Sequence, residues 1–235
     1  MENITAENLR KLIKKGVFGR VLYLRWKRLL KVPVAVYELS ELEELDLSNN
    51  YLKELPRSIQ KLRNLTSLIL DWNQLRELPH SICELSNLTW LYVNNNQLSL
   101  LPSNIKHLKK LWGLDLDNNQ LTALPDEIGE LKELRELYVS NNKLTVLTSH
   151  IKHLSELRVL DLINNQLTTL PYNEIGELKE LRWLSVAGNP LTLEEMRKVV
   201  KLENKMEFVI YKDVKGKYMK MLIICIYVIY VMYCE

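Results

Sequence analysis

The chain has 235 residues, enough for one or two compact domains or one elongated repeat array, and its 47% hydrophobic content does not limit burial. The net charge of +3 is unevenly placed, with +5 in residues 1–41, −4 in residues 42–191 and +2 in residues 192–235. A mildly acidic body with basic ends lacks the one-sided basic stripe of nucleic-acid-binding proteins, so we expect no direct nucleic-acid partner.

The cysteines and the N-terminal residues indicate a cellular compartment. The three cysteines, Cys83, Cys225 and Cys234, are few, odd in number and scattered. Residues 1–5 lack the basic start and apolar core of a signal peptide. Both observations favour a reducing environment, so we expect a cytoplasmic protein, with the nucleus as a further possibility.

Residues 1–18 are predicted to form an N-terminal capping helix. Thr5 is a candidate N-cap, and Leu9, Leu12 and Ile13 share one face of a helix over residues 5–15. Such a helix would cover the first exposed end of a repeat array.

Residues 19–191 repeat with a period of 23, in the pattern L-x-x-L-x-L-x-x-N-x-L-x-x-L-P-x-x-I-x-x-L. In the clearest copy the pattern falls on Leu42, Leu45, Leu47, Asn50, Leu52, Leu55, Pro56, Ile59 and Leu62. Later copies begin at Leu65, Leu88, Leu111, Leu134, Leu157 and Leu181. With a degenerate first copy from Gly19, the chain holds about eight copies, a period that predicts a solenoid.

Each position of the pattern has a physical reason. The L-x-L segment alternates with period two, so it is expected to be a short strand with its leucines inward, and stacked copies would form one parallel sheet. The asparagine is expected to be buried at the turn, where its amide can pair backbone groups that the turn leaves unpaired. The proline fixes φ at the start of the outer loop.

Three copies depart from the pattern. Lys27 replaces the asparagine in the first copy, and Thr148 replaces the proline in the sixth. The seventh copy gains one residue between Pro171 and Ile175. The last two changes fall in the outer half of the repeat, where insertions cost little.

Residues 17–203 resemble the intracellular leucine-rich-repeat proteins with 23-residue, LP-containing repeats, the group of Ras-binding scaffolds and Ras suppressors and their plant and microbial relatives. The likeness rests on the repeat pattern and on the closing Gly188-Asn189-Pro190-Leu191. It implies an α/β fold, a horseshoe-shaped solenoid with a parallel concave β-sheet and short helical or irregular convex segments. In that group the concave face binds small GTPases, phosphatase subunits or other signalling proteins, which implies a non-catalytic scaffold in signal transduction.

A second, shorter resemblance concerns the end of the array. Gly188-Asn189-Pro190-Leu191, a short helix and then residues 208–213 look like the leucine-rich-repeat arm of the carbon-catabolite-repression poly(A) deadenylase. In that enzyme the repeats dock the protein onto a companion nuclease. The likeness implies an alternative function, the docking arm of a deadenylase complex with the nuclease domain absent.

The C-terminal residues are predicted to hold a second cap and an apolar tail. Thr192 and Glu195 form a capping box that opens a helix over residues 192–205, with Leu193 among its inward residues. The tail, residues 206–235, includes an unbroken apolar run at 221–234. This run could pair with residues 208–211 as a hairpin, anchor the chain weakly to a membrane through residues 219–235, or be unselected sequence. As a helix the run would span ~21 Å, short of the ~30 Å hydrocarbon core of a bilayer, so membrane contact ranks last.

Function is expected on the concave face, where the variable strand positions point. Large aromatic residues and carboxylates interleave there, and nothing in the repeat demands the aromatics. The predicted partner-binding residues, here called the concave set, are Tyr23, Trp26, Asp46, Ile69, Asp71, Trp72, Trp90, Tyr92, Asp115, Asp117, Glu136, Tyr138, Asp161 and Trp183.

These residue types predict a protein partner, which the carboxylates would favour with a basic surface. The alternative is that the aromatics only fill gaps between neighbouring side chains on a flat sheet. Exposed apolar patches usually mark contacts, so we favour binding.

Catalytic and metal-binding patterns are weak. His150 and His153 are three residues apart but have no third ligand near them in the pattern. Asp115 and Asp117 lack a partner base, and neither a phosphate-binding glycine loop nor a nucleophile elbow occurs. We therefore expect no enzyme activity, no metal and no cofactor.

Overall fold

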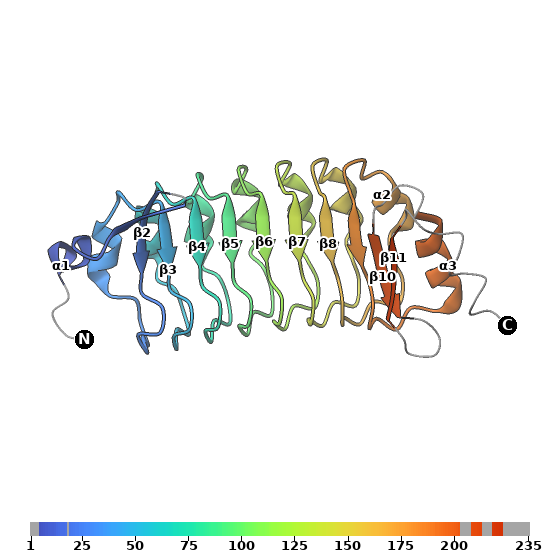
Figure 1. Cartoon of the computed structure of the whole chain (residues 1–235), viewed down its shortest axis with the longest axis horizontal. Coiled ribbons are helices and arrows are strands. Elements are labelled where there is room, and N and C mark those ends of the chain that lie inside the picture. The colour runs from blue at the N-terminus through green and yellow to red at the C-terminus, as the bar shows by residue number, and fades with distance from the viewer. Residues whose placement is uncertain (1–4, 18, 203–207, 213–217, 223–235) are drawn as a thin grey trace.

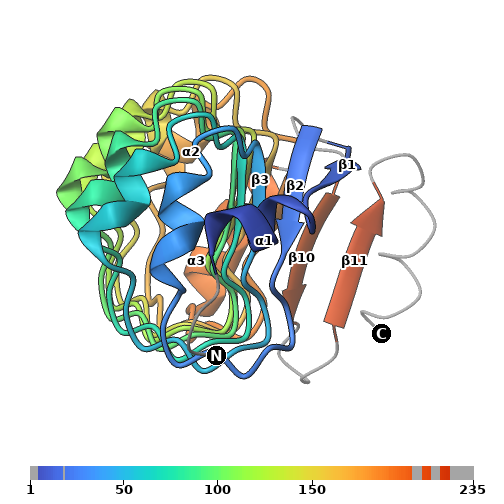
Figure 2. The same ribbon diagram turned by 90° about the vertical axis from the view of Figure 1, so that its left-hand side faces the viewer.

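The computed structural model describes residues 5–17, 19–202, 208–212 and 218–222. These residues form an elongated array in which successive strands stand side by side along the long axis (Figure 1). Seen from its end, the array has two layers, with the sheet on one side and a row of short helices on the other (Figure 2). The fold is therefore a leucine-rich-repeat solenoid, as the sequence predicts.

The described strands form one eleven-stranded sheet in sequence order. Strands β2 to β10 are parallel, and the antiparallel strands β1 and β11 close the two ends. The strands are β1 (Lys14–Gly16), β2 (Gly19–Tyr23), β3 (Glu44–Asp46), β4 (Ser67–Ile69), β5 (Trp90–Tyr92), β6 (Gly113–Asp115), β7 (Glu136–Tyr138), β8 (Val159–Asp161), β9 (Trp183–Ser185), β10 (Phe208–Lys212) and β11 (Tyr218–Leu222). Paired positions of β3 to β8 are 23 residues apart, so equivalent positions of the repeats form continuous columns across the sheet.

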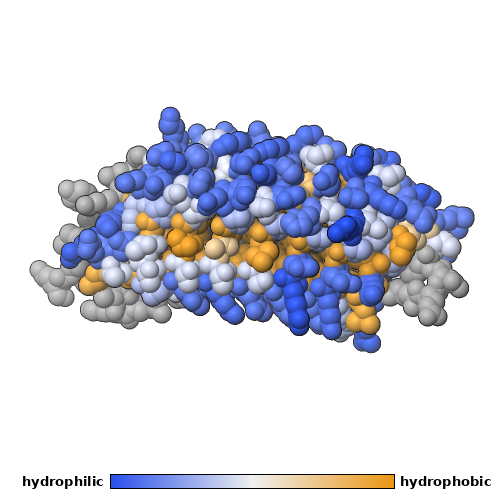
Figure 3. Space-filling view, turned by 180° about the vertical axis from the view of Figure 1, so that it is seen from behind, coloured by the Kyte–Doolittle hydropathy of each residue, from blue (hydrophilic) through white to orange (hydrophobic). Residues whose placement is uncertain are grey.

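The convex side is built from one short helix per repeat. The 3-10 helices are η1 (Val34–Glu38), η2 (Arg57–Lys61), η3 (His80–Glu84), η4 (Ser103–His107), η5 (Asp126–Glu130) and η6 (Ser149–His153). The seventh copy forms α2 (Tyr172–Gly176) instead, because its extra residue lengthens the turn. Figure 3 shows the face opposite to that of Figure 1, where an apolar band runs along the array between polar zones.

The core is a column of leucines repeated along the array. Leu45, Leu47, Leu52, Ile59 and Leu62 of the second copy are all fully buried, and their equivalents in later copies are buried too. Burial of each such side chain contributes roughly 1.5–3 kcal/mol. Since neighbouring copies supply most of the covering atoms, this stabilisation depends on stacking.

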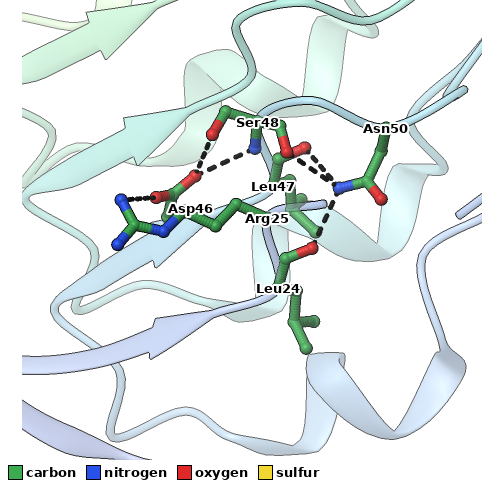
Figure 4. A network of polar contacts seen from close by, with 6 residues as sticks. All are labelled: Leu24, Arg25, Asp46, Leu47, Ser48 and Asn50. Atoms are coloured by element: carbon green, nitrogen blue, oxygen red, sulfur yellow. Dashed lines mark hydrogen bonds and ion pairs between the residues drawn. The ribbon is translucent and has the colours of Figure 1, made fainter. Parts of the chain in front are cut away.

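The recurring asparagine bridges adjacent repeats. Asn50 Nδ2 donates to the carbonyl oxygens of Leu47 at 2.8 Å and of Leu24, in the preceding repeat, at 2.9 Å (Figure 4). Its Oδ1 accepts from the Leu29 N–H at 2.9 Å. The same arrangement recurs at Asn73, Asn96, Asn119, Asn142, Asn165 and Asn189. We call this series the asparagine ladder.

The N-terminal cap is shorter than the sequence indicates. Helix α1 spans Ala6–Arg10, with the Oγ1 of Thr5 accepting the N–H of Asn8 at 3.2 Å. Leu9 is buried, whereas Leu12 is exposed. Residues 14–16 of the expected cap 1–18 form β1, because pairing with the edge of β2 satisfies backbone groups that a longer helix would leave open.

At the C-terminal end, α3 (Leu193–Leu202) begins after Thr192, whose Oγ1 accepts the N–H of Glu195 at 3.2 Å. Val199 faces the core, but Leu193, expected inward, is exposed because it lies in the first turn. Strand β10 pairs in parallel with β9. It pairs antiparallel with β11, an arrangement like the hairpin alternative for the tail. Residues 223–234 of the apolar run lie outside the described residues. Within the described part of the chain, no helix has the length and apolar character needed to cross a bilayer.

Candidate functional site

The concave set lies on the sheet face and on the turns that follow the strands. All of its members except Asp46 are half-buried or exposed. The most exposed are Trp26 and Trp72, at 72% and 58%. The structure thus brings the aromatic rings and the carboxylates to one side of the molecule.

Asp46 lies in its predicted column but is only 3% exposed. Its Oδ1 accepts the backbone N–H of Ser48 at 2.9 Å and the Ser48 hydroxyl at 2.6 Å (Figure 4). The Arg25 guanidinium lies 4.0 Å from its other oxygen. Asp46 therefore holds the turn after β3, and its contacts explain why it does not face a partner.

Trp90 has a role inside the fold as well as on the surface. A Cβ atom at Gly113, on the next strand, would collide with the six-membered ring of Trp90. The Trp90 ring therefore lies across Gly113, and it also stacks on Tyr92 with 5.7 Å between ring centroids. Trp90 therefore also fills a gap between neighbouring side chains, which was the alternative to a binding role.

Three carboxylates at the centre of the face share a hydrogen-bond network. Asp71 accepts the Asn94 N–H at 3.0 Å, Asp115 accepts the Asn94 side-chain amide at 2.7 Å, and Asp117 accepts the Ser140 N–H at 2.6 Å. Among the described residues, no Lys, Arg or His nitrogen lies within 4.0 Å of these three carboxylates. They form a negative surface that the fold itself leaves unpaired with cations.

The environment of two of these carboxylates raises their pKa values. Burial, and then the charge of Asp115, raises the pKa of Asp71 to about 7. The same two causes raise the pKa of Asp117 to about 7. At pH 8 both groups are charged and poorly solvated, so a cation from a partner would relieve their repulsion.

The turn column before the asparagine ladder has a left-handed backbone. Asn49, Asn95, Asn118, Asn141 and Asn164 have φ between 53° and 56°, and Gly188 has φ 73°. Trp26 and Trp72 occupy the same column with φ of 60° and 55°. A left-handed conformation costs a residue with a bulky side chain roughly 1–2 kcal/mol, whereas Asn and Gly tolerate it.

A hollow of about 400 Å³ lies beside these two tryptophans. We call it the rim hollow, and it is lined by Trp26, Arg28, Asn49, Asn50, Tyr51 and Trp72. The sequence places both tryptophans in one column, but their left-handed backbone was not predicted from it. The recurrence of Asn at the other positions of that column is the sequence signal that could have indicated it.

A column of cationic residues lies at the N-terminal ends of the strands, and it was not predicted from the sequence. The Arg135 guanidinium lies over the Trp112 ring at 4.7 Å from the centroid. Arg158 follows Arg135 in this column, with its N–H donating to the Arg135 carbonyl at 2.8 Å. A wide hollow of about 450 Å³ on the same edge is partly closed by its own contacts, such as Arg20 with Glu43 at 3.5 Å.

One family model matches most of the chain. The model described as "Leucine-rich repeat region" matches residues 18–113 and 77–207. The chain belongs to the leucine-rich-repeat family. No curated protein sequence matches this leucine-rich-repeat chain.

Solved leucine-rich-repeat structures share the fold. A leucine-rich-repeat protein of Leptospira interrogans is 29% identical with a TM-score of 0.60, over 87% of this chain and 62% of that one. The internalin InlF of Listeria monocytogenes is 22% identical with a TM-score of 0.71, over 83% of this chain and 57% of that one, a likeness that shows the fold alone.

The third structure is a plant complex. The ectodomain of the receptor kinase GASSHO1/SCHENGEN3 from Arabidopsis thaliana, in complex with CASPARIAN STRIP INTEGRITY FACTOR 2, is 31% identical with a TM-score of 0.67. The match covers 78% of this chain and 22% of that one. This chain thus spans less than two thirds of each of the three proteins.

His150, His153 and Cys83 of this leucine-rich-repeat array lie apart from the concave set. His150 Nδ1 lies 3.2 Å from Asp126 Oδ1 on the convex side, and its ring meets His153 edge-on at 5.7 Å. No group of three or more potential metal ligands occurs in the described parts of the chain. Burial raises the pKa of the Cys83 thiol to about 12, which keeps it protonated.

Proposed function

We propose that this leucine-rich-repeat chain is a non-catalytic scaffold or adaptor that holds a protein partner with a basic surface on its concave face. The observation that carries the proposal is the alternation of Tyr92, Asp115 and Tyr138 in one column of the sheet centre. Aromatic rings supply large contact areas at interfaces, and unpaired carboxylates select Lys and Arg. The plant ectodomain, which is in complex with CASPARIAN STRIP INTEGRITY FACTOR 2, supports a binding role for the repeats.

The finer family assignment belongs to the same proposal. The 23-residue LP-type repeats support a place beside the intracellular Ras-binding scaffolds and Ras suppressors, with a role in signal transduction. The scattered cysteines support a cytoplasmic or nuclear site of action.

The test is a quantitative pull-down with the double variant Tyr92→Ala/Asp115→Asn. These residues are paired across β5 and β6 and are both half-buried, so the change removes one ring and one charge from the centre of the face. We expect recovery of the bound proteins to fall about tenfold, a loss of ~1.4 kcal/mol. Raised salt should lower wild-type recovery as well, because the attraction is partly electrostatic.

The control is the double variant Val34→Ser/His107→Ala, which changes two exposed residues of η1 and η4 on the convex side. It should recover the same proteins as the wild-type chain. Equal recovery by the concave variant, with an unchanged melting temperature, would show that the concave face is not the binding surface.

A second candidate function is the docking arm of a deadenylase complex. It is supported by the order of Gly188-Asn189-Pro190-Leu191, α3 and then β10 at the end of the array. Mass spectrometry of the same pull-down separates the two candidates. If no deadenylase subunit is recovered, the docking-arm proposal is wrong.

A further inference from the structure

Trp26 and Trp72 differ from Trp90 and Trp112 in their contacts. The Trp90 ring covers Gly113, and Trp112 stacks on Arg135. Within the described residues, Trp26 and Trp72 make no ring contact and no side-chain hydrogen bond, and both are mostly exposed. Each sits in a strained left-handed turn position where five other copies have Asn.

Backbone strain retained at an exposed position points to function, because a fold without that function has no reason to keep it. Here two strained tryptophans flank the same rim hollow, with Asn49 between them. Exposed aromatic walls around a hollow are typical of surfaces that bind extended peptides. The rim hollow is therefore the strongest candidate for a site with a defined ligand.

The spacing of the two tryptophans selects the kind of peptide. They lie two repeats apart, and strands of a sheet are about 4.8 Å apart, so their backbone positions are about 9.6 Å apart along the array. A polyproline II helix rises about 3.1 Å per residue with three residues per turn, so residues i and i+3 are about 9.3 Å apart on one side of the helix. We propose that the rim hollow binds a proline-rich segment in the polyproline II conformation, with residues i and i+3 against Trp72 and Trp26.

The polar groups of the hollow fit the same ligand. A polyproline II segment makes no internal hydrogen bonds, so its carbonyl groups need donors. The Asn49 side-chain amide lies between the tryptophans and has no hydrogen-bond partner among the described residues, which makes it available to such a carbonyl. The indole N–H groups of Trp26 and Trp72 are further donors.

The positive charge around the rim hollow predicts which charged residues the bound segment should carry. Arg28 lines the hollow, and Arg25 and Lys27 lie on the same exposed turn. Arg28 and Lys27 form no ion pair within the described residues. The segment should therefore carry Asp or Glu next to its prolines, in contrast to the basic surface expected opposite Asp71, Asp115 and Asp117.

This inference deepens the proposed function and rests on it in part, since both tryptophans belong to the concave set. It concerns the rim alone, so one partner could place a basic surface on the sheet and an acidic proline-rich segment on the rim. The two sites can be tested separately because Tyr92 and Asp115 do not line the hollow.

The experiment is calorimetric titration of the full chain with a synthetic peptide of six consecutive prolines, about two turns of polyproline II helix, flanked by glutamates. The control peptide keeps the glutamates and replaces the prolines by alternating Gly and Ser. We expect measurable binding of the proline peptide, with a change in tryptophan fluorescence, and at least about tenfold weaker binding of the control.

The variants Trp26→Asn and Trp72→Asn should each weaken proline-peptide binding about tenfold. Asn is the residue that five other copies place there, so each variant should melt at the same temperature as the wild-type chain or higher. The matched control Trp112→Phe, on the opposite edge, should bind as the wild-type chain does. Loss of binding in the Asn variants thus cannot come from misfolding.

The inference is overturned by no binding of the proline peptide at ~1 mM, or by equal binding of the two peptides. Unchanged affinity in both Asn variants would overturn it too. Tyr92→Ala/Asp115→Asn should leave peptide affinity unchanged. If Tyr92→Ala/Asp115→Asn loses the protein partner and the proline peptide does not bind the wild-type chain, the rim inference is wrong and the scaffold proposal stands. If that variant keeps the protein partner and the proline peptide binds the wild-type chain, the scaffold proposal is wrong and the rim inference stands.

Discussion

Five repeats end their strand turn with two consecutive asparagines that have different tasks. Asn118 has a left-handed backbone and an exposed side chain. Asn119 is buried and donates to the carbonyls of Val93 and Leu116 at 2.9 and 3.0 Å, while the Leu98 N–H donates to its Oδ1 at 2.9 Å. The first asparagine can be replaced wherever strain is tolerated, and the second cannot.

The substitution Asn119→Leu should therefore destabilise the array strongly. It leaves two carbonyls and one N–H buried without partners, at about 1–3 kcal/mol for each group. We expect a loss of at least about 3 kcal/mol in the free energy of unfolding, measured by urea denaturation. Asn118→Gly is the control and should change stability by less than about 0.5 kcal/mol, because glycine accepts positive φ. A smaller effect at Asn119 than at Asn118 would contradict this account of the asparagine ladder.

At the level of elements, the strands of the sheet are short, and the exposure of a side chain on the sheet face depends on the side chains of the neighbouring strands. Ser67 and Gly113 face the same side as Trp90, yet both are buried. The Trp90 ring spans from β5 over β6 and so covers a position on another repeat. Which side chains of the sheet face are accessible therefore depends on pairs of adjacent strands.

The substitution Gly113→Ala tests this packing. The added methyl group would force the Trp90 ring off β6, so tryptophan fluorescence should shift to the red and stability should fall by about 1–3 kcal/mol. Gly176→Ala is the control, because among the described residues its Cβ would meet Leu202 at 3.6 Å, an ordinary contact. If Gly113→Ala left both the spectrum and the stability unchanged, the covering role of Trp90 would be wrong.

The same distinction explains what the sequence could predict. The buried positions of Leu45 and Asn50 follow from the repeat period, because each has a task set by its own place in the repeat. The burial of Asp46 does not follow, since it depends on Ser48 and on Arg25 in the neighbouring copy. Likewise β1 takes residues expected in a helix, because pairing with β2 is a tertiary contact.

At the scale of the whole molecule, charge is divided between the sheet face and its N-terminal end. Residues 42–191 carry a net charge of −4 and residues 1–41 carry +5. Asp71 follows β4, two strands and so about 10 Å from the basic turn after β2, and Asp115 and Asp117 lie further along the array. Surface screening over such distances limits any compensation between the two. The folded array consequently keeps an unfavourable negative centre that a partner can neutralise.

This charge distribution predicts a pH dependence of stability. Burial raises the folded-state pKa values of Asp71 and Asp117 to about 7, from the ordinary aspartate value of 3.8, so both groups stay protonated in the fold after the unfolded chain has lost those protons. Their contribution to stability is therefore fully present below about pH 4 and is lost as the pH rises through 7.

The double variant Asp71→Asn/Asp117→Asn should be more stable than the wild-type chain at pH 8. The gain should be about 1–2 kcal/mol at each site, discounted from the full shift because both carboxylates keep some solvent contact. The gain should vanish near pH 4, as thermal melts at both pH values can show. Glu54→Gln, an exposed site, is the control. Equal gains at the two pH values would contradict the raised pKa values.

The asparagine ladder also gives the array a direction. Every ladder asparagine bonds back to the repeat before it, as Asn73 does to Leu47 and Leu52. The first copy has Lys27 at the ladder position, and the segment paired on its outer side is the antiparallel strand β1. A ribosome delivers the N-terminal repeats first, so each new repeat emerges with the side chain that fastens it to the finished one. The array can thus close in the order of its synthesis, without waiting for residues that have not yet been made.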